Sequence, residues 1–222
     1  MMISNMPKYN KNLSIIIVNF RSEDYLEKCL ASVYKMVSGE ILAEVVVVNN
    51  DEPDKLTEIS KKFPGIKIIH QKENAGFGAS NNLGVKIAQG ELLLFLNPDT
   101  EIFSGNIEEI INEFEKNEKM GVIGPKLLKI SGKSQEWSAG LEKNLWDLIR
   151  NNTGLIKSQK IWKSEKKIEA HWVAGTAMFT KKELFEKIGG FDEKYFMYFE
   201  DVDFCKGVRK AGKRIEIGRA HV

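Results

Sequence analysis

Short runs of β-branched and aliphatic residues alternate along this chain with segments whose apolar residues recur at helical spacing. The runs are Leu13–Asn19, Val45–Val48, Ile66–Ile69 and Leu92–Leu96, with a shorter candidate at Gly121–Gly124. Each has the length of a strand and is apolar on both faces, as strands buried in a parallel sheet are. Strands that alternate with helices form βαβ units. The sequence therefore predicts an α/β fold, a single Rossmann-like domain with a mostly parallel central sheet and helices on both faces.

The predicted helices lie between these runs, where apolar residues recur every three or four positions. Their stripes are Leu26 to Val37, Leu56 to Phe63, Val85 to Ala88, Ile107 to Phe114 and Lys181 to Ile188. Apolar patterning also returns at Trp172–Phe179. Residues 125–170 are less regular and carry Trp137, Trp146 and Trp162, which either belong to an inserted loop or lid or pack on one another over the sheet.

Length and composition narrow the class of protein. The 222 residues suit one medium-sized domain, and 42% apolar and 29% charged residues are ordinary for a globular chain. A net charge of +2 gives no sign of a nucleic-acid partner. We expect a disordered segment at 1–12 and one domain at 13–216.

Cysteine usage and the apolar runs bear on location. Cys29 and Cys205 lie far apart in the chain, which favours a reducing compartment over a disulfide. The first residues lack an apolar signal-peptide core, and no apolar run reaches the length of a membrane span. We expect a cytoplasmic protein whose membrane contact, if any, is peripheral at the inner face.

Polar residues follow the first, second and fourth predicted strands. They are Asn19, the cluster Asn49–Glu52 and the cluster Asn97–Asp99. In open parallel sheets, ligands bind at the carboxyl ends of the strands. Asn and Asp also make ordinary turns, but three such clusters at one edge favour a ligand-binding rim.

Two acidic clusters carry the chemistry. Asp99 follows a buried strand, and one carboxylate is enough to hold Mg²⁺ or Mn²⁺ if a diphosphate supplies the other ligands. The second cluster is Glu200, Asp201 and Asp203 within an aromatic segment. Aromatic surroundings raise the pKa of a carboxyl group and favour a general base, while the same acidic residues would also suit a helix N-terminus.

The glycine-rich stretch Gly76–Gly78 is not a dinucleotide fingerprint, because no acidic residue follows at the required place. Two roles remain open. The turn either brings the backbone close beneath a nucleotide or packs a helix on the sheet.

Taken together, these motifs resemble those of family 2 glycosyltransferases with the GT-A fold, in the rhamnosyltransferase-like branch. The resemblance runs from about Leu13 to Ile215 and rests on segments whose order and spacing are specific. They are Ser14–Phe20, Val47–Asn50, Asn74–Gly84, Leu94–Thr100, Gly189–Asp192 and Phe196–Asp203.

The resemblance implies a role for each site residue. Val18, Asn19, Asn49, Asn50, Asn74, Asn81 and Asn97 would bind the donor, Asp99 would hold the metal ion, Gly175, Thr176 and Glu200 would bind the acceptor, and Asp201 would be the catalytic base. The implied reaction is inverting transfer from a nucleoside-diphosphate sugar, dTDP-rhamnose or a UDP-sugar, to a hydroxyl of a cell-surface glycan or lipid-linked acceptor.

Two positions depart from the family pattern. Asn49 stands where the family more often has Asp, and Gly207 stands where it usually has Arg. The first departure bears on which nucleotide base is bound.

Other expectations concern the end of the chain. Ile217–Val222 matches the translation of a common sequencing adapter, so we predict a non-native tail at 217–222 on a chain that naturally continues further. A nucleotide-sugar-binding fragment without turnover is therefore the alternative function. A nucleotidyltransferase is disfavoured, because no glycine-rich loop follows the first strand.

Overall fold

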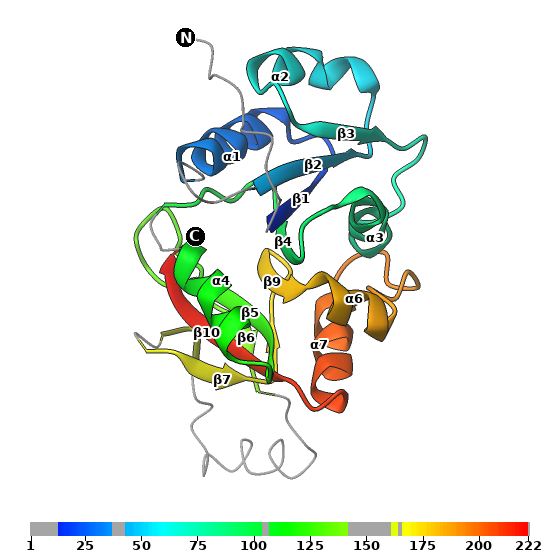
Figure 1. Ribbon diagram of the computed structural model, residues 1–222. Helices are drawn as coiled ribbons and strands as arrows, with labels where there is room; N and C mark the ends of the chain where they lie inside the picture. Colours follow the sequence, from blue (N-terminus) through cyan, green and yellow to red (C-terminus); the bar gives the residue numbers. More distant parts are fainter. Residues whose placement is uncertain (1–12, 37–42, 104–106, 142–160, 164–165, 222) are drawn as a thin grey trace, which may run out of the picture.

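The computed structural model describes residues 13–36, 43–103, 107–141, 161–163 and 166–221. Within these residues, strands and helices alternate around one eight-stranded sheet (Figure 1). The predicted disordered segment 1–12 and Trp146 lie outside the described residues.

The central sheet has the strand order β3-β2-β1-β4-β9-β5-β10-β7. Its strands are β1 (Leu13–Asn19), β2 (Ala43–Asn49), β3 (Lys67–His70), β4 (Leu92–Leu96), β5 (Met120–Lys126), β7 (Ile168–Ala170), β9 (Ala177–Lys181) and β10 (Arg214–His221). All neighbouring pairs are parallel except those of β9 with β4 and β5, and that of β7 with β10. The sheet is mostly parallel, so the predicted fold class is confirmed.

Helices cover both faces of this sheet (Figure 1). One core joins the sheet to α1 (Glu23–Met36), α2 (Thr57–Lys62), the short 3₁₀ helix η1 (Pro53–Leu56) and α4 (Ile107–Lys116). The other joins it to α3 (Phe77–Ile87), α6 (Lys182–Ile188) and α7 (Glu200–Lys210). Successive side chains of a strand point to opposite faces, so Ile15 and Ile17 enter the first core and Ile16 enters the second.

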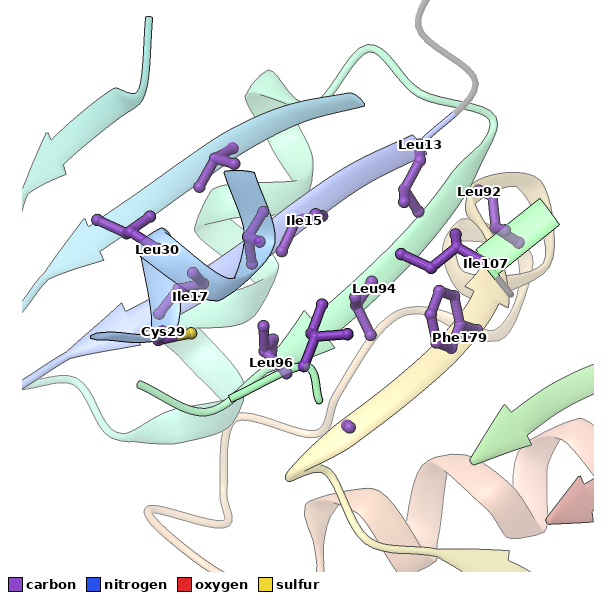
Figure 2. Close-up of a cluster of buried hydrophobic side chains, with 14 of the residues drawn as sticks. Leu13, Ile15, Ile17, Cys29, Leu30, Leu92, Leu94, Leu96, Ile107 and Phe179 are labelled. Carbon is purple, nitrogen blue, oxygen red and sulfur yellow. The ribbon is translucent and has the colours of Figure 1, made fainter. Parts of the chain in front are cut away.

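Figure 2 shows part of the first core, where aliphatic side chains of β1 and β4 meet those of α1 and α4. Ile15, Ile17 and Leu30 are 0% exposed. Burying each such side chain stabilises the fold by about 1.5–3 kcal/mol. This packing fixes the strands whose carboxyl ends form the rim.

The apolar segment Trp172–Phe179 contributes to two strands. β8 (Trp172–Val173) pairs with β6 (Ala139–Gly140) in a separate two-stranded sheet, and β9 then enters the central sheet. The turn between them contains Gly175 and Thr176. It lies next to the polar end of β4, because the N–H of Asn97 donates to the carbonyl of Thr176 over 2.9 Å.

The irregular region contains a short 3₁₀ helix, η2 (Ile161–Lys163). Two tryptophans of the irregular region pack together, with the ring centroids of Trp137 and Trp162 5.5 Å apart.

β10 continues to His221 and therefore includes residues predicted to be a non-native tail, whose origin stays a prediction. Cys29 and Cys205 are both buried and free, as expected. Among the described residues, no helix is long and apolar enough to span a membrane.

Candidate active site

The carboxyl ends of β1 and β2 meet at the rim of the sheet. Asn19 and Asn49 are register partners, and Nδ2 of Asn19 donates to Oδ1 of Asn49 over 2.8 Å. Nδ2 of Asn49 in turn donates to the carbonyls of Asp51 at 2.9 Å and Glu52 at 3.3 Å. Both asparagines are 0% exposed. Their amide groups therefore fix the turn after β2 from within the protein.

Asn50 is the centre of a second polar network. Its Nδ2 donates to Oδ1 of Asn74 and to Oγ of Ser80, both at 2.9 Å, and its Oδ1 accepts from Nε2 of Gln71 at 2.6 Å. Asn50 is only 5% exposed. The network ties the end of β2 to the turn that opens α3.

The predicted donor residues thus fall into two groups. Asn19, Asn49, Asn50 and Asn81 are buried, and the amide of Asn81 donates to the carbonyl of Phe77 over 3.0 Å. Partly exposed are Val18, Asn74 and Asn97. Only this second group offers side-chain surface to a ligand in this conformation.

Asp99 is exposed in the turn that follows β4. The turn is closed by a hydrogen bond of 3.2 Å from the N–H of Thr100 to the carbonyl of Asn97. Burial raises the pKa of the Cys29 thiol beneath this turn, and the nearby charges of Asp99 and Glu101 raise it further. Asp99 and Glu101 thus bring carboxyl groups to this point of the rim, and carboxylate oxygens are the ligands that a hard cation prefers.

No three His, Cys, Asp or Glu residues are grouped to hold a metal ion in the part of the chain that the structure describes. An exposed carboxylate such as Asp99 still fits Mg²⁺ or Mn²⁺, if a diphosphate completes the ligand set. The donor set is therefore compatible with a cation that binds together with a nucleotide.

Asp201 lies in the first turn of α7, and backbone N–H groups hold its carboxylate. Oδ2 accepts from Gly175 over 2.8 Å, and Oδ1 accepts from Val202 over 2.7 Å. Burial raises the pKa of Asp201, while these two hydrogen bonds counteract part of that increase. The turn between β8 and β9 thereby orients a carboxylate from a different part of the chain.

Glu200 is a second unusual carboxyl group. It is 4% exposed, and its Oε2 has no hydrogen-bond partner among the residues that the structure describes. Burial, with a smaller effect of the Asp201 charge, raises the pKa of Glu200 to about 7. The two neighbouring carboxyl groups therefore differ: that of Asp201 is held by hydrogen bonds, whereas that of Glu200 has a buried oxygen without a partner in the described part of the chain.

The sequence predicted raised pKa values here but attributed them to the wrong side chains. Phe196, Met197, Tyr198 and Phe199 are 49–72% exposed, so they do not enclose the carboxylates, whereas Phe204, the last aromatic residue of the segment, is 1% exposed in the second core. Glu200 instead packs beside Gly78 of α3, where an added Cβ would lie 3.6 Å from the Glu200 Cβ. Burial between α7 and α3 replaces the expected aromatic enclosure.

Gly207 lies on another face of α7, against α6. An added Cβ there would lie 2.7 Å from Cγ2 of Ile188, so Ile188 occupies the space next to the glycine. A cavity of about 540 Å³ adjoins this position and is lined by Asn82, Asp192, Asp203 and Lys206, among others. Asp201 is not part of this lining, so this cavity is separate from the Asp201 carboxylate.

Comparison with solved structures shows the class of fold. The crystal structure of Staphylococcus aureus TarS 1–349 matches with a TM-score of 0.66 over 93% of this chain and 57% of that one, at 21% identity. At that identity the likeness shows the fold alone, the GT-A architecture. A profile of glycosyl transferase family 2 matches residues 14–189. The chain therefore belongs to glycosyl transferase family 2.

Relatives of known role include the low-salt glycan biosynthesis hexosyltransferase Agl10 of Haloferax volcanii. It is 31% identical over 215 residues, which are 95% of this chain and 65% of Agl10. The N-acetylglucosaminyl-diphospho-decaprenol L-rhamnosyltransferase of Mycobacterium tuberculosis is 25% identical over 90% of this chain and 71% of its own length. Rhamnosyltransferase WbbL of Escherichia coli is 28% identical over 90% and 78%.

Proposed function

We propose that this protein transfers a sugar from a nucleoside-diphosphate sugar, dTDP-rhamnose or a UDP-sugar, to a hydroxyl of a cell-surface glycan or lipid-linked acceptor. The observation that carries this proposal is the half-buried Asp201 carboxylate, held by two backbone N–H groups at the ligand-binding edge of a family 2 fold. The relatives include rhamnosyl and hexosyl transferases, which supports the donor and acceptor classes. A lipid-linked acceptor would bring the protein to the membrane surface peripherally.

The proposed reaction is a single displacement with inversion at the anomeric carbon. Asp201 accepts the proton of the acceptor hydroxyl as that oxygen forms its bond to the anomeric carbon. The bond from this carbon to the diphosphate oxygen breaks, and the nucleoside diphosphate leaves with the electron pair. A divalent cation held by Asp99 would neutralise the negative charge that builds on the leaving group.

The rest of the site would bind and orient the reactants. Asn74, Asn97 and Val18 offer exposed surface to the donor, while Asn19, Asn49, Asn50 and Asn81 shape the turns around it from beneath. Gly175 contacts Asp201, Thr176 follows Gly175 in the same turn, and Glu200 would meet the acceptor beside Asp201. The two N–H bonds to Asp201 keep its oxygens oriented, so little reorganisation is needed when the proton moves.

The test is Asp201→Asn, with release of UDP or dTDP from UDP-N-acetylglucosamine or dTDP-L-rhamnose measured in the presence of an N-acetylglucosaminyl-diphospho-lipid acceptor. Loss of the base should lower kcat by about 10³-fold, with nucleotide binding retained. Asp203→Asn, exposed two positions along the same helix, is the matched control. Full activity of Asp201→Asn would show that another group is the base. Nucleotide binding without any release by the unaltered chain would support a binding function instead.

A further inference from the structure

The glycine-rich turn at the start of α3 contacts the segment that carries the acidic motif. We propose that Phe77 is a positioning residue for Asp201, because its ring supports Gly175 and its backbone N–H holds Phe196. The inference rests on the proposed function, in which Asp201 is the base. It assigns a role to a motif whose purpose the sequence left open.

The ring of Phe77 lies against Gly175. An added Cβ on Gly175 would be only 3.0 Å from Cε1 and 3.1 Å from Cζ of this ring. The N–H of the same glycine donates the 2.8 Å hydrogen bond to Oδ2 of Asp201. The ring therefore limits where this N–H, and with it the carboxylate, can lie.

The backbone of the glycine-rich turn also holds Phe196, at the start of the segment that leads to Asp201. The N–H of Phe77 donates to the carbonyl of Phe196 over 3.0 Å. At Gly76, where φ is +85°, an added Cβ would lie 2.1 Å from that same carbonyl oxygen. Only a glycine allows so close an approach of the two backbones.

The segment from Phe196 to α7 is strained and needs this support. Tyr198 and Phe199 have φ values of 69° and 72°, in the left-handed region that aromatic residues rarely adopt. Such conformations cost about 1–3 kcal/mol each and persist only where surrounding contacts enforce them. The hydrogen bond to Phe196 is such a contact, and it sets the start of the helix that carries Asp201.

The turn is itself anchored on the donor side. Oδ1 of Asn74 accepts from the N–H of Gly76 at 3.0 Å and from Nδ2 of Asn50 at 2.9 Å. Phe77 is half-buried, and its ring centroid lies 6.0 Å from that of Phe191. The turn held by Asn74, the packed ring of Phe77 and the hydrogen-bonded Gly175 therefore form a continuous series of contacts that ends at Asp201.

The central variant is Phe77→Ala, which removes the ring and keeps the backbone N–H. A misplacement of about 1 Å in a catalytic group can cost about 100-fold in rate, so we expect kcat to fall about 10- to 100-fold. The affinity for UDP or dTDP, measured by calorimetry, should stay within about twofold of the unaltered chain. Phe77→Leu, which fills part of the space, should restore part of kcat.

Phe63→Leu is the matched control, because Phe63 is 0% exposed in the core on the opposite face. It should lower stability and leave kcat unchanged. A kcat of Phe77→Ala within about twofold of the unaltered chain would overturn the inference. So would weakened nucleotide binding at unchanged kcat, which would assign the turn to the donor.

Two further measurements test the inference if Phe77→Ala folds poorly or if the chain does not accept the donors used. Gly175→Ala should lower kcat, because the added methyl group would press on the ring of Phe77. The double variant Gly175→Ala, Phe77→Leu should recover activity, because the smaller side chain makes room for that methyl group. Absence of recovery would contradict the coupling between Phe77 and Gly175. Without any substrate, hydrogen exchange of the Gly175 amide should be at least about tenfold faster in Phe77→Ala. The Asn50 amide, bonded to the Asn19 carbonyl, is the internal reference. Unchanged Gly175 exchange would overturn the inference.

Asp201→Asn in the same assays separates the two proposals. If it stays active, the assignment of the base fails whatever Phe77→Ala does. If it is inactive while Phe77→Ala is fully active, only the positioning role fails.

Discussion

The backbone N–H of Gly175 donates a hydrogen bond of 2.8 Å to Oδ2 of Asp201, across 26 positions of the chain. Gly175 follows β8, and Asp201 is in the first turn of α7, so the contact joins the turn after a strand to the start of a helix. It orients the carboxylate and lowers its pKa against the effect of burial.

Asp99→Ala should remove metal-dependent nucleotide binding. Because Asp99 is the exposed carboxylate at the end of β4, we expect UDP or dTDP to bind more tightly with Mn²⁺ than without it, and the variant to lose that difference. Calorimetry with and without Mn²⁺ measures this directly. Glu115→Ala, exposed on α4, is the control. Equal Mn²⁺ dependence in Asp99→Ala would place the cation elsewhere.

Gly76→Ala should destabilise the fold much more than Gly65→Ala. Both glycines have positive φ, +85° and +103°, so both variants carry backbone strain. Gly65 has no atom within 4 Å of an added Cβ, whereas at Gly76 the Phe196 carbonyl is 2.1 Å away. We expect a loss of about 1 kcal/mol for Gly65→Ala and at least about 3 kcal/mol for Gly76→Ala in urea unfolding. Similar losses would mean that strain, and not the close approach, is what requires Gly76.

Glu200→Gln should change how stability depends on pH. Burial raises the pKa of Glu200 from 4.5 to about 7, so between these values the folded protein holds a proton that the unfolded chain has released. The contribution of Glu200 to stability is therefore fully present below pH 4.5 and is lost as pH rises toward 7. A glutamine stays neutral, so relative to the unaltered chain the variant should be more stable at pH 8 than at pH 5.

Thermal unfolding at the two pH values measures this difference, with the exposed Asp203→Asn as control. An identical difference between Glu200→Gln and the unaltered chain at both pH values would contradict a raised Glu200 pKa.

Asn49→Asp should destabilise the turn after β2. Nδ2 of Asn49 donates to the carbonyls of Asp51 and Glu52, and a carboxylate cannot donate to either. The side chain is 0% exposed, so we expect a loss of at least about 2 kcal/mol in urea unfolding at neutral pH. Asn112→Asp, exposed on α4, should be nearly neutral. A stable Asn49→Asp would mean that the turn repacks around the carboxylate.

The elements of the fold could be predicted from the sequence because their signals are local. The β-branched run Leu13–Asn19 is a strand with its predicted bounds, and Gly121–Gly124 lies within the longer β5. The third strand is shifted by one residue, to Lys67–His70. The rim also followed from the sequence, because polar residues directly after parallel strands must lie at the same edge.

Strand order and direction were decided by the tertiary structure. Nothing within Ala177–Lys181 indicates that this strand runs antiparallel between β4 and β5. Nor does the sequence show that β10 pairs with both β5 and β7. These choices depend on which distant segments can bury apolar surface together, and no local pattern contains that information.

The same division holds for the site. The sequence by itself predicted which residues would carry the chemistry, since acidic and amide groups stand out directly after apolar runs. Only the tertiary structure decided how these groups are used: Asn49 and Asn50 turn inward, Gly76 meets Phe196, and Gly175 orients Asp201. The physical reason is that exposure, hydrogen-bond partners and pKa all depend on atoms contributed by other parts of the chain, which come within contact distance only when the layers pack.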